Sequence, residues 1–177
     1  VRVKTGERVS LIGSNGAGKT TFVNMITGYV RADSGSIWLG GTDISRMNPR
    51  QITRMGVARS FQIPQLYPSM TVLENMLVAL ACHENRLSTW LPAATSARVL
   101  RADEVLSRFN LLKQRDRLVS ELPGGLRKLI DIALAMTGAP RLLLLDEPTS
   151  GVAAEEKFPM MDTIMLALEG QALTVLF

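Results

Sequence analysis

Cysteine and histidine are almost absent from this chain, which has one of each among its 177 residues. The single cysteine, Cys82, excludes a disulfide framework and fits a protein of a reducing compartment. The single histidine, His83, excludes a metal cluster built from histidine side chains. Both residues stand at the end of an apolar helical run, so we expect them to pack against neighbouring side chains.

Long hydrophobic runs are missing as well. No stretch approaches the roughly 18 uninterrupted apolar residues of a membrane span. Residues 1–7 do not have the pattern of a secretory signal peptide. Hydrophobic residues nevertheless make up 46% of the sequence, which is enough for a proper core. We therefore expect one folded domain, or one domain with an inserted subdomain.

Positive charge is in slight excess but is not clustered. The net charge is +4, and Arg46, Arg50, Arg54 and Arg59 are scattered, without aromatic residues between them. Grooves that bind single-stranded nucleic acid interleave basic and aromatic side chains. We therefore expect these arginines to form a solvated basic face, and we expect no nucleic-acid partner.

A phosphate-loop motif is the most informative feature that the sequence does contain. Residues 13–20, Gly-Ser-Asn-Gly-Ala-Gly-Lys-Thr, match the pattern G-x-x-x-x-G-K-[ST] at every fixed position. Residues 8–12 read as a short buried strand, and residues 20–27 as a helix closed by Gly28. Strand, glycine-rich loop and helix form the context that this motif requires, so the sequence predicts a nucleotide triphosphate site.

The residue types of the loop explain how it would bind phosphate. Gly13, Gly16 and Gly18 let successive backbone N–H groups point at phosphate oxygens, and the helix N-terminus adds to that field. Lys19 supplies a positive charge to the β- and γ-phosphates, and the Thr20 hydroxyl is the expected magnesium ligand. The predicted nucleotide-binding residues of this segment are Gly13, Ser14, Asn15, Gly16, Ala17, Gly18, Lys19, Thr20 and Thr21.

Apolar periodicity and turn residues divide the rest of the chain into further elements. The spacing predicts helices over 71–81, 97–112 and 125–138, the first opened by a capping box at Thr71 and Glu74. It predicts short strands at 35–40 and 42–45, and buried parallel strands at 142–145 and 173–177.

An acidic pair, Asp146 and Glu147, directly follows the expected buried strand 142–145. In a parallel α/β sheet, ligand-binding groups gather at the carboxyl ends of the strands. We therefore expect Asp146 to bind magnesium through its water shell. Glu147 would polarise the attacking water as a general base.

With these motifs the chain resembles the ATPase subunits of ABC transporters over essentially its whole length. The resemblance implies that Gln62 senses the γ-phosphate, takes part in catalysis and contacts the permease. It implies that Thr20, Gln62 and Asp146 surround the magnesium ion. It also implies that Gly124 and Gly125, where the family signature reads Leu-Ser-Gly-Gly-Gln, bind the nucleotide of a partner subunit.

The sequence departs from the family pattern at several positions. Pro123 and Leu126 replace the serine and the glutamine of the signature, and Ala153 stands where the family carries aspartate or asparagine. This proline, together with residues 56–62 and 70–75, resembles the branched-chain amino acid uptake branch. The family's switch histidine and adenine-stacking aromatic are not found within residues 1–177, so the chain looks truncated at both ends.

The resemblance implies a fold, a function and partners. The fold is α/β, a P-loop NTPase with a RecA-like parallel sheet core, a small antiparallel β portion and an inserted ABC-type helical subdomain. The core would comprise residues 1–67 and 140–177, and the helical subdomain residues 68–139. The protein would bind and hydrolyse ATP with Mg²⁺, pair with an identical or paralogous ATPase subunit, and drive a permease that imports branched-chain or related amino acids. It would lie peripherally on the cytoplasmic face of a bacterial inner membrane.

Two classes of alternative share the phosphate loop: a small-molecule kinase or GTPase, and a soluble ABC ATPase. A small-molecule kinase would need a basic lid, for which Arg127 and Lys128 are the suggestive pair, and a GTPase would need the Asn-Lys-x-Asp motif that is missing here. A soluble ABC ATPase acting on ribosomes or DNA would carry tandem halves or long coiled coils, and the insert shows no sustained heptads.

Overall fold

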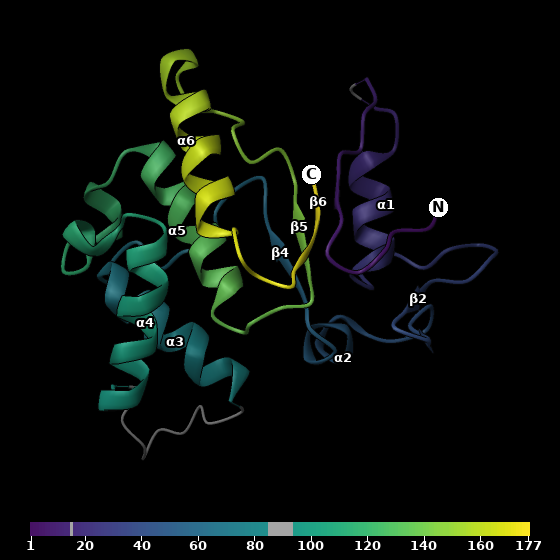
Figure 1. The fold of residues 1–177 in the computed structure, drawn as a ribbon, viewed down its shortest axis with the longest axis horizontal. Helices are drawn as coiled ribbons and strands as arrows, with labels where there is room; N and C mark the ends of the chain where they lie inside the picture. Colours follow the sequence, from purple (N-terminus) through teal and green to yellow (C-terminus); the bar gives the residue numbers. More distant parts are fainter. Residues whose placement is uncertain (15, 85–93) are drawn as a thin grey trace.

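The computed structural model describes residues 1–14, 16–84 and 94–177, and a parallel β-sheet lies at its centre (Figure 1). The strand order is β1-β6-β5-β4, and every neighbouring pair is parallel. The strands are β1 (Arg8–Val9), β4 (Val57–Ser60), β5 (Leu142–Leu145) and β6 (Thr174–Leu176). The chain therefore has the α/β fold with a parallel core that the sequence predicts.

Strand β5 is buried on both faces because its four residues are all leucine. Leu143 and Leu145 belong to one apolar cluster, which includes side chains of the later helices. Leu142 and Leu144 belong to a second cluster on the other face, together with Val23 of the first helix. Burying a leucine side chain stabilises a fold by about 1.5–3 kcal/mol, so this strand anchors the sheet.

Helices cover both faces of the sheet. Figure 1 shows α1 on one side, and α5 and α6 on the other. A small antiparallel sheet and one short helix lie near α1. The elements concerned are α1 (Lys19–Ile26), β2 (Trp38–Leu39), β3 (Thr42–Asp43), α2 (Pro49–Arg54), α5 (Gly124–Met136) and α6 (Ala154–Ala167).

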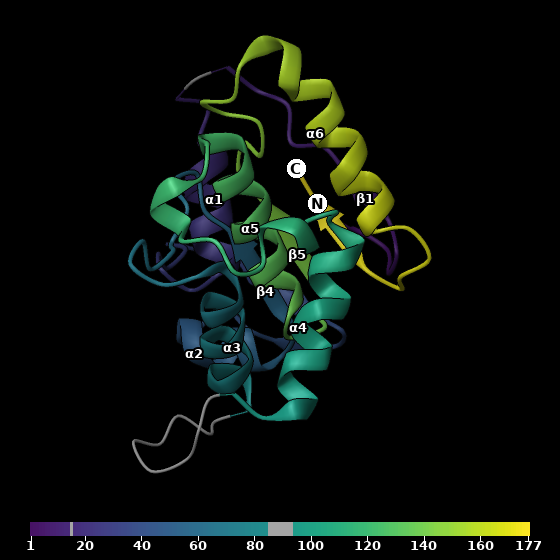
Figure 2. The ribbon, with the colours of Figure 1, turned by 90° about the vertical axis from the view of Figure 1, so that its left-hand side faces the viewer.

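The remaining helices pack against α5, away from the sheet (Figure 2). They are α3 (Val72–His83) and α4 (Ser96–Arg108), followed by two 3₁₀ turns, η1 (Leu112–Gln114) and η2 (Val119–Glu121). The predicted capping box at the start of α3 is confirmed, because Glu74 N donates to Thr71 Oγ1 at 3.1 Å and Thr71 N donates to Glu74 Oε2 at 2.7 Å. Helix α5 thus contacts the sheet on one side and α3 and α4 on the other.

Several boundaries differ from the expected ones for physical reasons. The helix expected over 97–112 ends at Arg108, because Asn110 has a φ of 56° that no right-handed helix accepts. The strand expected over 8–12 pairs with β6 only at Arg8 and Val9, although Leu11 N still donates to Phe177 O at 2.8 Å. The expected strands at 35–40 and 42–45 pair only over β2 and β3.

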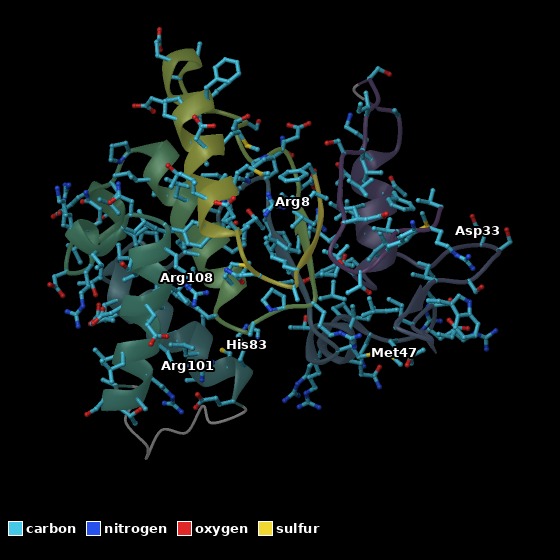
Figure 3. All side chains as sticks on the ribbon, in the orientation of Figure 1. Arg8, Asp33, Met47, His83, Arg101 and Arg108 are labelled. Carbon is cyan, nitrogen blue, oxygen red and sulfur yellow. The ribbon has the colours of Figure 1, made fainter. Side chains whose placement is uncertain are left out.

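The packing role expected for Cys82 is wrong, because this residue is exposed. His83 is exposed in part, but its ring lies against the backbone after α5. A Cβ atom at Gly138 would lie 2.6 Å from Cε1 of His83, so the two chain segments meet closely here. Arg101 lies beside His83 (Figure 3).

Candidate functional site

The phosphate loop curls between β1 and α1. Gly16 and Gly18 have φ values of 83° and 88°, in the left-handed region that favours glycine. A Cβ atom at Gly13 would lie 2.9 Å from Cβ of Ala17, so only glycine fits there. The expected contribution of Asn15 lies outside the described residues.

Lys19, the first residue of α1, folds back over this loop. Its Nζ donates hydrogen bonds to the backbone oxygens of Gly13 at 2.6 Å and Ser14 at 3.1 Å. Thr20 and Thr21 are exposed on the first turn of the same helix. A lysine ammonium, the backbone of a glycine-rich loop and a helix N-terminus therefore gather at one exposed segment, which is the chemistry of an anion site.

Asp146 lies at the carboxyl end of β5, where it is almost fully buried. Arg59 NH2 of the neighbouring strand β4 donates to Asp146 Oδ2 at 2.7 Å. Arg59 NH1 donates to Asn24 Oδ1 on α1 at 2.6 Å, and the guanidinium carbon lies 5.1 Å from the centre of the Phe61 ring. The solvated position expected for Arg59 is therefore wrong, because this side chain joins β4 and β5 to α1.

Glu147 and Gln62 meet beside Asp146. Gln62 Nε2 lies 3.5 Å from Glu147 Oε2, at the long limit of a hydrogen bond, and both side chains are exposed. Glu147 has a φ of 48°, a left-handed conformation that is strained for a residue with a side chain. Strain of this kind is often found at functional sites, so the geometry directs attention to this carboxylate.

Two buried charged residues of α5 complete the surroundings of Gln62. Asp131 accepts hydrogen bonds from Ser60 Oγ, Phe61 N and Gln65 N. Lys128 Nζ donates to the backbone oxygens of Phe61, Gln62 and Asp146. Sequence reasoning considered Lys128 only as part of a kinase lid and did not consider Asp131. The available signal was the presence of Asp131 among the apolar residues 129–136 of the helix, three positions after Lys128.

Burial shifts the pKa values of these two groups in opposite directions. Desolvation lowers the pKa of the Lys128 ammonium and raises the pKa of the Asp131 carboxyl group. The hydrogen bonds that Asp131 accepts and the nearby Lys128 oppose the rise. Both groups are thus removed from water and depend on protein partners.

Gly124 and Gly125 form the start of α5, and Gly124 is exposed. A cavity of about 300 Å³ adjoins this helix start, and its lining includes Gln62, Gly124, Lys128 and Gly151. Helices α1 and α5 lie on opposite faces of the sheet (Figure 1). The phosphate loop, which leads into α1, and the two glycines, which begin α5, therefore belong to opposite faces of the sheet.

Oxygen ligands that suit magnesium follow the carboxyl ends of three strands, with Thr20 after β1, Gln62 after β4 and Asp146 after β5. The Thr20 hydroxyl, the Gln62 amide oxygen and the Asp146 carboxylate are hard donors of the type that Mg²⁺ prefers. Within the described ranges, no group of three or more histidine, cysteine, aspartate or glutamate side chains could form a metal centre. A metal here would therefore combine these few ligands with phosphate oxygens and water.

A protein-family model and several relatives match this chain. The family model described as "ABC transporter" matches residues 1–150. The probable branched-chain amino acid transport ATP-binding protein LivG of Archaeoglobus fulgidus is 39% identical over 157 residues, which are 86% of this chain and 61% of the relative. LivG of Escherichia coli K12 is 40% identical over 160 residues, or 85% and 62%. The lipopolysaccharide export system ATP-binding protein LptB of Acidithiobacillus ferridurans is 38% identical over 152 residues, or 86% and 60%.

Solved structures agree with this match. The ADP conformation of MJ1267, an ATP-binding cassette of an ABC transporter, has a TM-score of 0.83 at 34% identity. The match covers 97% of this chain and 69% of the MJ1267 chain. The dimeric cassette MJ0796 bound to ADP and Pi has a TM-score of 0.79 at 25% identity, covering 99% and 76%. The chain spans about three fifths of the length of the curated relatives it matches.

Proposed function

Since the chain belongs to the ABC transporter family, we propose that it is the ATP-binding and ATP-hydrolysing subunit of an importer for branched-chain or related amino acids. The ATP-binding part of this proposal is supported most directly by residues that meet at one edge of the sheet. The phosphate loop, Asp146 and Glu147 all follow the carboxyl ends of parallel strands, which is where α/β proteins bind nucleotides.

In this proposal the phosphate loop binds the triphosphate of ATP. Backbone N–H groups of residues 13–20 donate to phosphate oxygens, and Lys19 exchanges its contacts with Gly13 and Ser14 for the β- and γ-phosphates. Thr20, Gln62 and Asp146 are the proposed magnesium ligands. The metal, when bound, neutralises charge on the phosphates.

Glu147 is the proposed general base. Its carboxylate accepts a proton from the water that attacks the γ-phosphorus, while the bond from that phosphorus to the bridging oxygen breaks and ADP leaves with the electron pair. Gln62 Nε2, which lies 3.5 Å from Glu147 Oε2, orients that carboxylate and the water. The other groups position charge and do no covalent chemistry, as is usual for phosphoryl transfer.

A second ATPase subunit would complete the nucleotide site. The proposed nucleotide contacts Gly124 and Gly125 lie on the opposite face of the sheet from the chain's own phosphate loop, so they suit the nucleotide of a partner, identical or paralogous. The similarity to a dimeric cassette supports this arrangement. The helical subdomain, proposed at residues 68–139, would present these glycines from the insert between core segments 1–67 and 140–177.

A permease would contact the segment around Gln62. Ile63 and Tyr67 are 74% and 55% exposed, an apolar surface that suits a protein partner. No helix in the described ranges is both long and apolar enough to cross a membrane. From the family match and the relatives named as transport ATP-binding proteins, we propose a peripheral position on the cytoplasmic face of a bacterial inner membrane, with no nucleic-acid partner.

The amino-acid substrate is proposed from the relatives named LivG, which are 39% and 40% identical to this chain. A relative named for lipopolysaccharide export is 38% identical, so the substrate is a separate proposal from the ATPase activity. The family match and these relatives do not favour the soluble ABC ATPase or the kinase alternative.

Replacing Lys19 tests the nucleotide assignment. Lys19→Ala should weaken Mg-ATP binding by about 10- to 100-fold, the equivalent of one charged hydrogen bond. Isothermal titration calorimetry measures this affinity directly. Lys113→Ala is the matched control, because Lys113 is exposed on η1 and should leave binding unchanged. Equal ATP affinity in the Lys19 variant and the unmodified chain would contradict the assignment.

A further inference from the structure

Asp131 holds both ends of the loop that carries Gln62. Its Oδ2 accepts from Ser60 Oγ at 2.7 Å and from Phe61 N at 3.1 Å, on the near side of Gln62. Its Oδ1 accepts from Gln65 N at 3.1 Å, on the far side. One carboxylate therefore uses both of its oxygens to close residues 60–65 into a loop on the surface of α5.

Lys128 holds the middle of the same loop. Its Nζ donates to the backbone oxygen of Phe61, to that of Gln62 at 3.4 Å, and to that of Asp146 at 3.4 Å. The side chain is only 2% exposed. This single ammonium group therefore joins the backbone of Gln62 to the residue that precedes Glu147.

The cost of these contacts indicates a role beyond stability. A charge loses favourable hydration when it is buried, and apolar side chains of similar size often stabilise a buried position equally well. The negative charges of Asp131, Asp146 and Glu147 offset only part of the cost of burying Lys128, since desolvation still lowers its pKa. The charged pair gives directional contacts at fixed points of the loop, which apolar packing cannot give.

From this geometry we propose that Lys128 and Asp131 are positioning residues that fix the Gln62 loop (residues 60–65) to α5. Movement of this loop then moves Gly124 and Gly125. Gly124 lies four residues before Lys128, about 6 Å along the helix axis. The cavity lined by Gln62, Gly124 and Lys128 shows that the loop and the start of α5 face a common space. The inference rests on the proposed function: the pair would transmit the state of Gln62 to the surface that binds the partner's nucleotide.

Deuterium exchange with and without Mg-ATP tests this coupling. The variants are Asp131→Asn, which has one oxygen and cannot accept from both sides of the loop, and Lys128→Met, which keeps a long apolar side chain. Asp162→Asn and Lys113→Met are the controls, because both residues are exposed. Lys128→Arg, which keeps the charge, should restore part of the effect that Lys128→Met removes.

The expected results separate positioning from folding. Asp131→Asn and Lys128→Met should each bind ATP with an affinity within about threefold of that of the unmodified chain. The amides of residues 60–65 should exchange about tenfold faster in Asp131→Asn, because the one remaining oxygen can serve Phe61 N or Gln65 N but not both. ATP should protect residues 122–127 in the unmodified chain and in both controls. It should not protect them in Asp131→Asn or Lys128→Met.

Three results would overturn the inference. None of them would affect the proposed function, which depends on whether the chain binds ATP through Lys19. These three results are unchanged exchange of residues 60–65, ATP protection of residues 122–127 that persists in both variants, and no such protection in the unmodified chain. If Asp131→Asn does not fold, Ser60→Ala removes one donor to the carboxylate and should give the same changes to a smaller extent. Loss of ATP binding by the unmodified chain would reject the proposed function itself.

Discussion

Arg59 and Asp146 form an ion pair that is largely removed from water, with side-chain exposures of 10% and 9%. The guanidinium also contacts Asn24 and the ring of Phe61, while its Nε has no hydrogen-bond partner among the described residues. A buried pair of this kind adds little net stability compared with apolar packing. Removing one partner is costly, because the other charge stays buried without compensation.

The Arg59→Met variant should therefore lose about 3–5 kcal/mol of unfolding free energy, since Asp146 would keep a buried charge without its counter-ion. Urea unfolding followed by circular dichroism measures the loss. Arg50→Met is the matched control, because Arg50 is exposed and its replacement should change stability by no more than about 0.5 kcal/mol. Similar losses in the two variants would show that the ion pair does not matter for stability.

Local motifs made part of the site predictable. The sequence predicts roles for Lys19 and Asp146, because phosphate and magnesium require certain residue types next to a glycine loop or a strand end. It does not predict the roles of Arg59 and Asp131, because these depend on partners far along the chain. Arg59 is 87 positions from Asp146, and Ser60 is 71 positions from Asp131. Only the folded sheet brings these residues together.

At the scale of elements, the end of α1 depends on Gly28. This residue has a φ of 76°, and a Cβ atom there would lie 2.8 Å from Cδ1 of Ile52 and 2.9 Å from the backbone oxygen of Met47. The Ile52 side chain could rotate, but the oxygen of Met47 belongs to the backbone. Gly28 therefore allows α1 to end where the segment leading into α2 crosses it.

Gly28→Ala and Gly35→Ala separate backbone strain from steric overlap. Both glycines have positive φ, so each variant should lose about 1–2 kcal/mol from the left-handed conformation. Gly35 has open space around it, whereas Gly28 does not, so Gly28→Ala should lose a further 1–3 kcal/mol, roughly the cost of overpacking. Thermal unfolding of the two variants gives the difference. Equal melting temperatures would contradict the close approach.

The contact between the end of α3 and Gly138 should depend on pH. Burial lowers the pKa of His83, and the nearby positive charge of Arg101 lowers it further. The unfolded chain therefore takes up a proton at a higher pH than the folded chain. This part of the stability is present above about pH 6.5 and is lost as the pH falls below that value.

His83→Asn should accordingly show a smaller fall in melting temperature between pH 8 and pH 5 than the unmodified chain, roughly the range that brackets the free histidine pKa. The two curves should converge at low pH, where the unmodified chain has lost this contribution. Parallel curves over the whole range would show that His83 does not titrate differently in the two states.

The elements that sequence reasoning missed have recognisable causes. Strand β4 contains Arg59, whose burial depends on Asp146, so apolar periodicity does not reveal it. Helix α6 contains Pro159, which normally ends a helix. Helix α2 has only six residues, although Asn48 and Gln51 form a complete capping box that marked its start. By contrast, the four leucines of β5 were sufficient on their own.

At the scale of the whole molecule, the placement of Gly124 and Gly125 predicts assembly with a second chain when ATP is bound. Glu147→Gln should bind ATP but barely hydrolyse it, so any ATP-bound dimer should persist. Light scattering with ATP should then give twice the mass found with ADP. The double variant with Lys19→Ala is the control and should remain monomeric. If Glu147→Gln binds ATP tightly but stays monomeric, the predicted ATP-bound dimer of identical chains is contradicted.

Strand β1 pairs only with β6 among the described strands, through Arg8 with Val175 and Val9 with Leu176. The phosphate loop therefore follows a two-residue strand whose partner, β6, comes much later in the sequence. On the ribosome, the loop proposed to bind ATP is made before residues 174–176, so it gains this anchor only when those residues have emerged and joined the sheet. The proposed phosphate loop therefore lacks this strand pairing during the synthesis of the residues between β1 and β6.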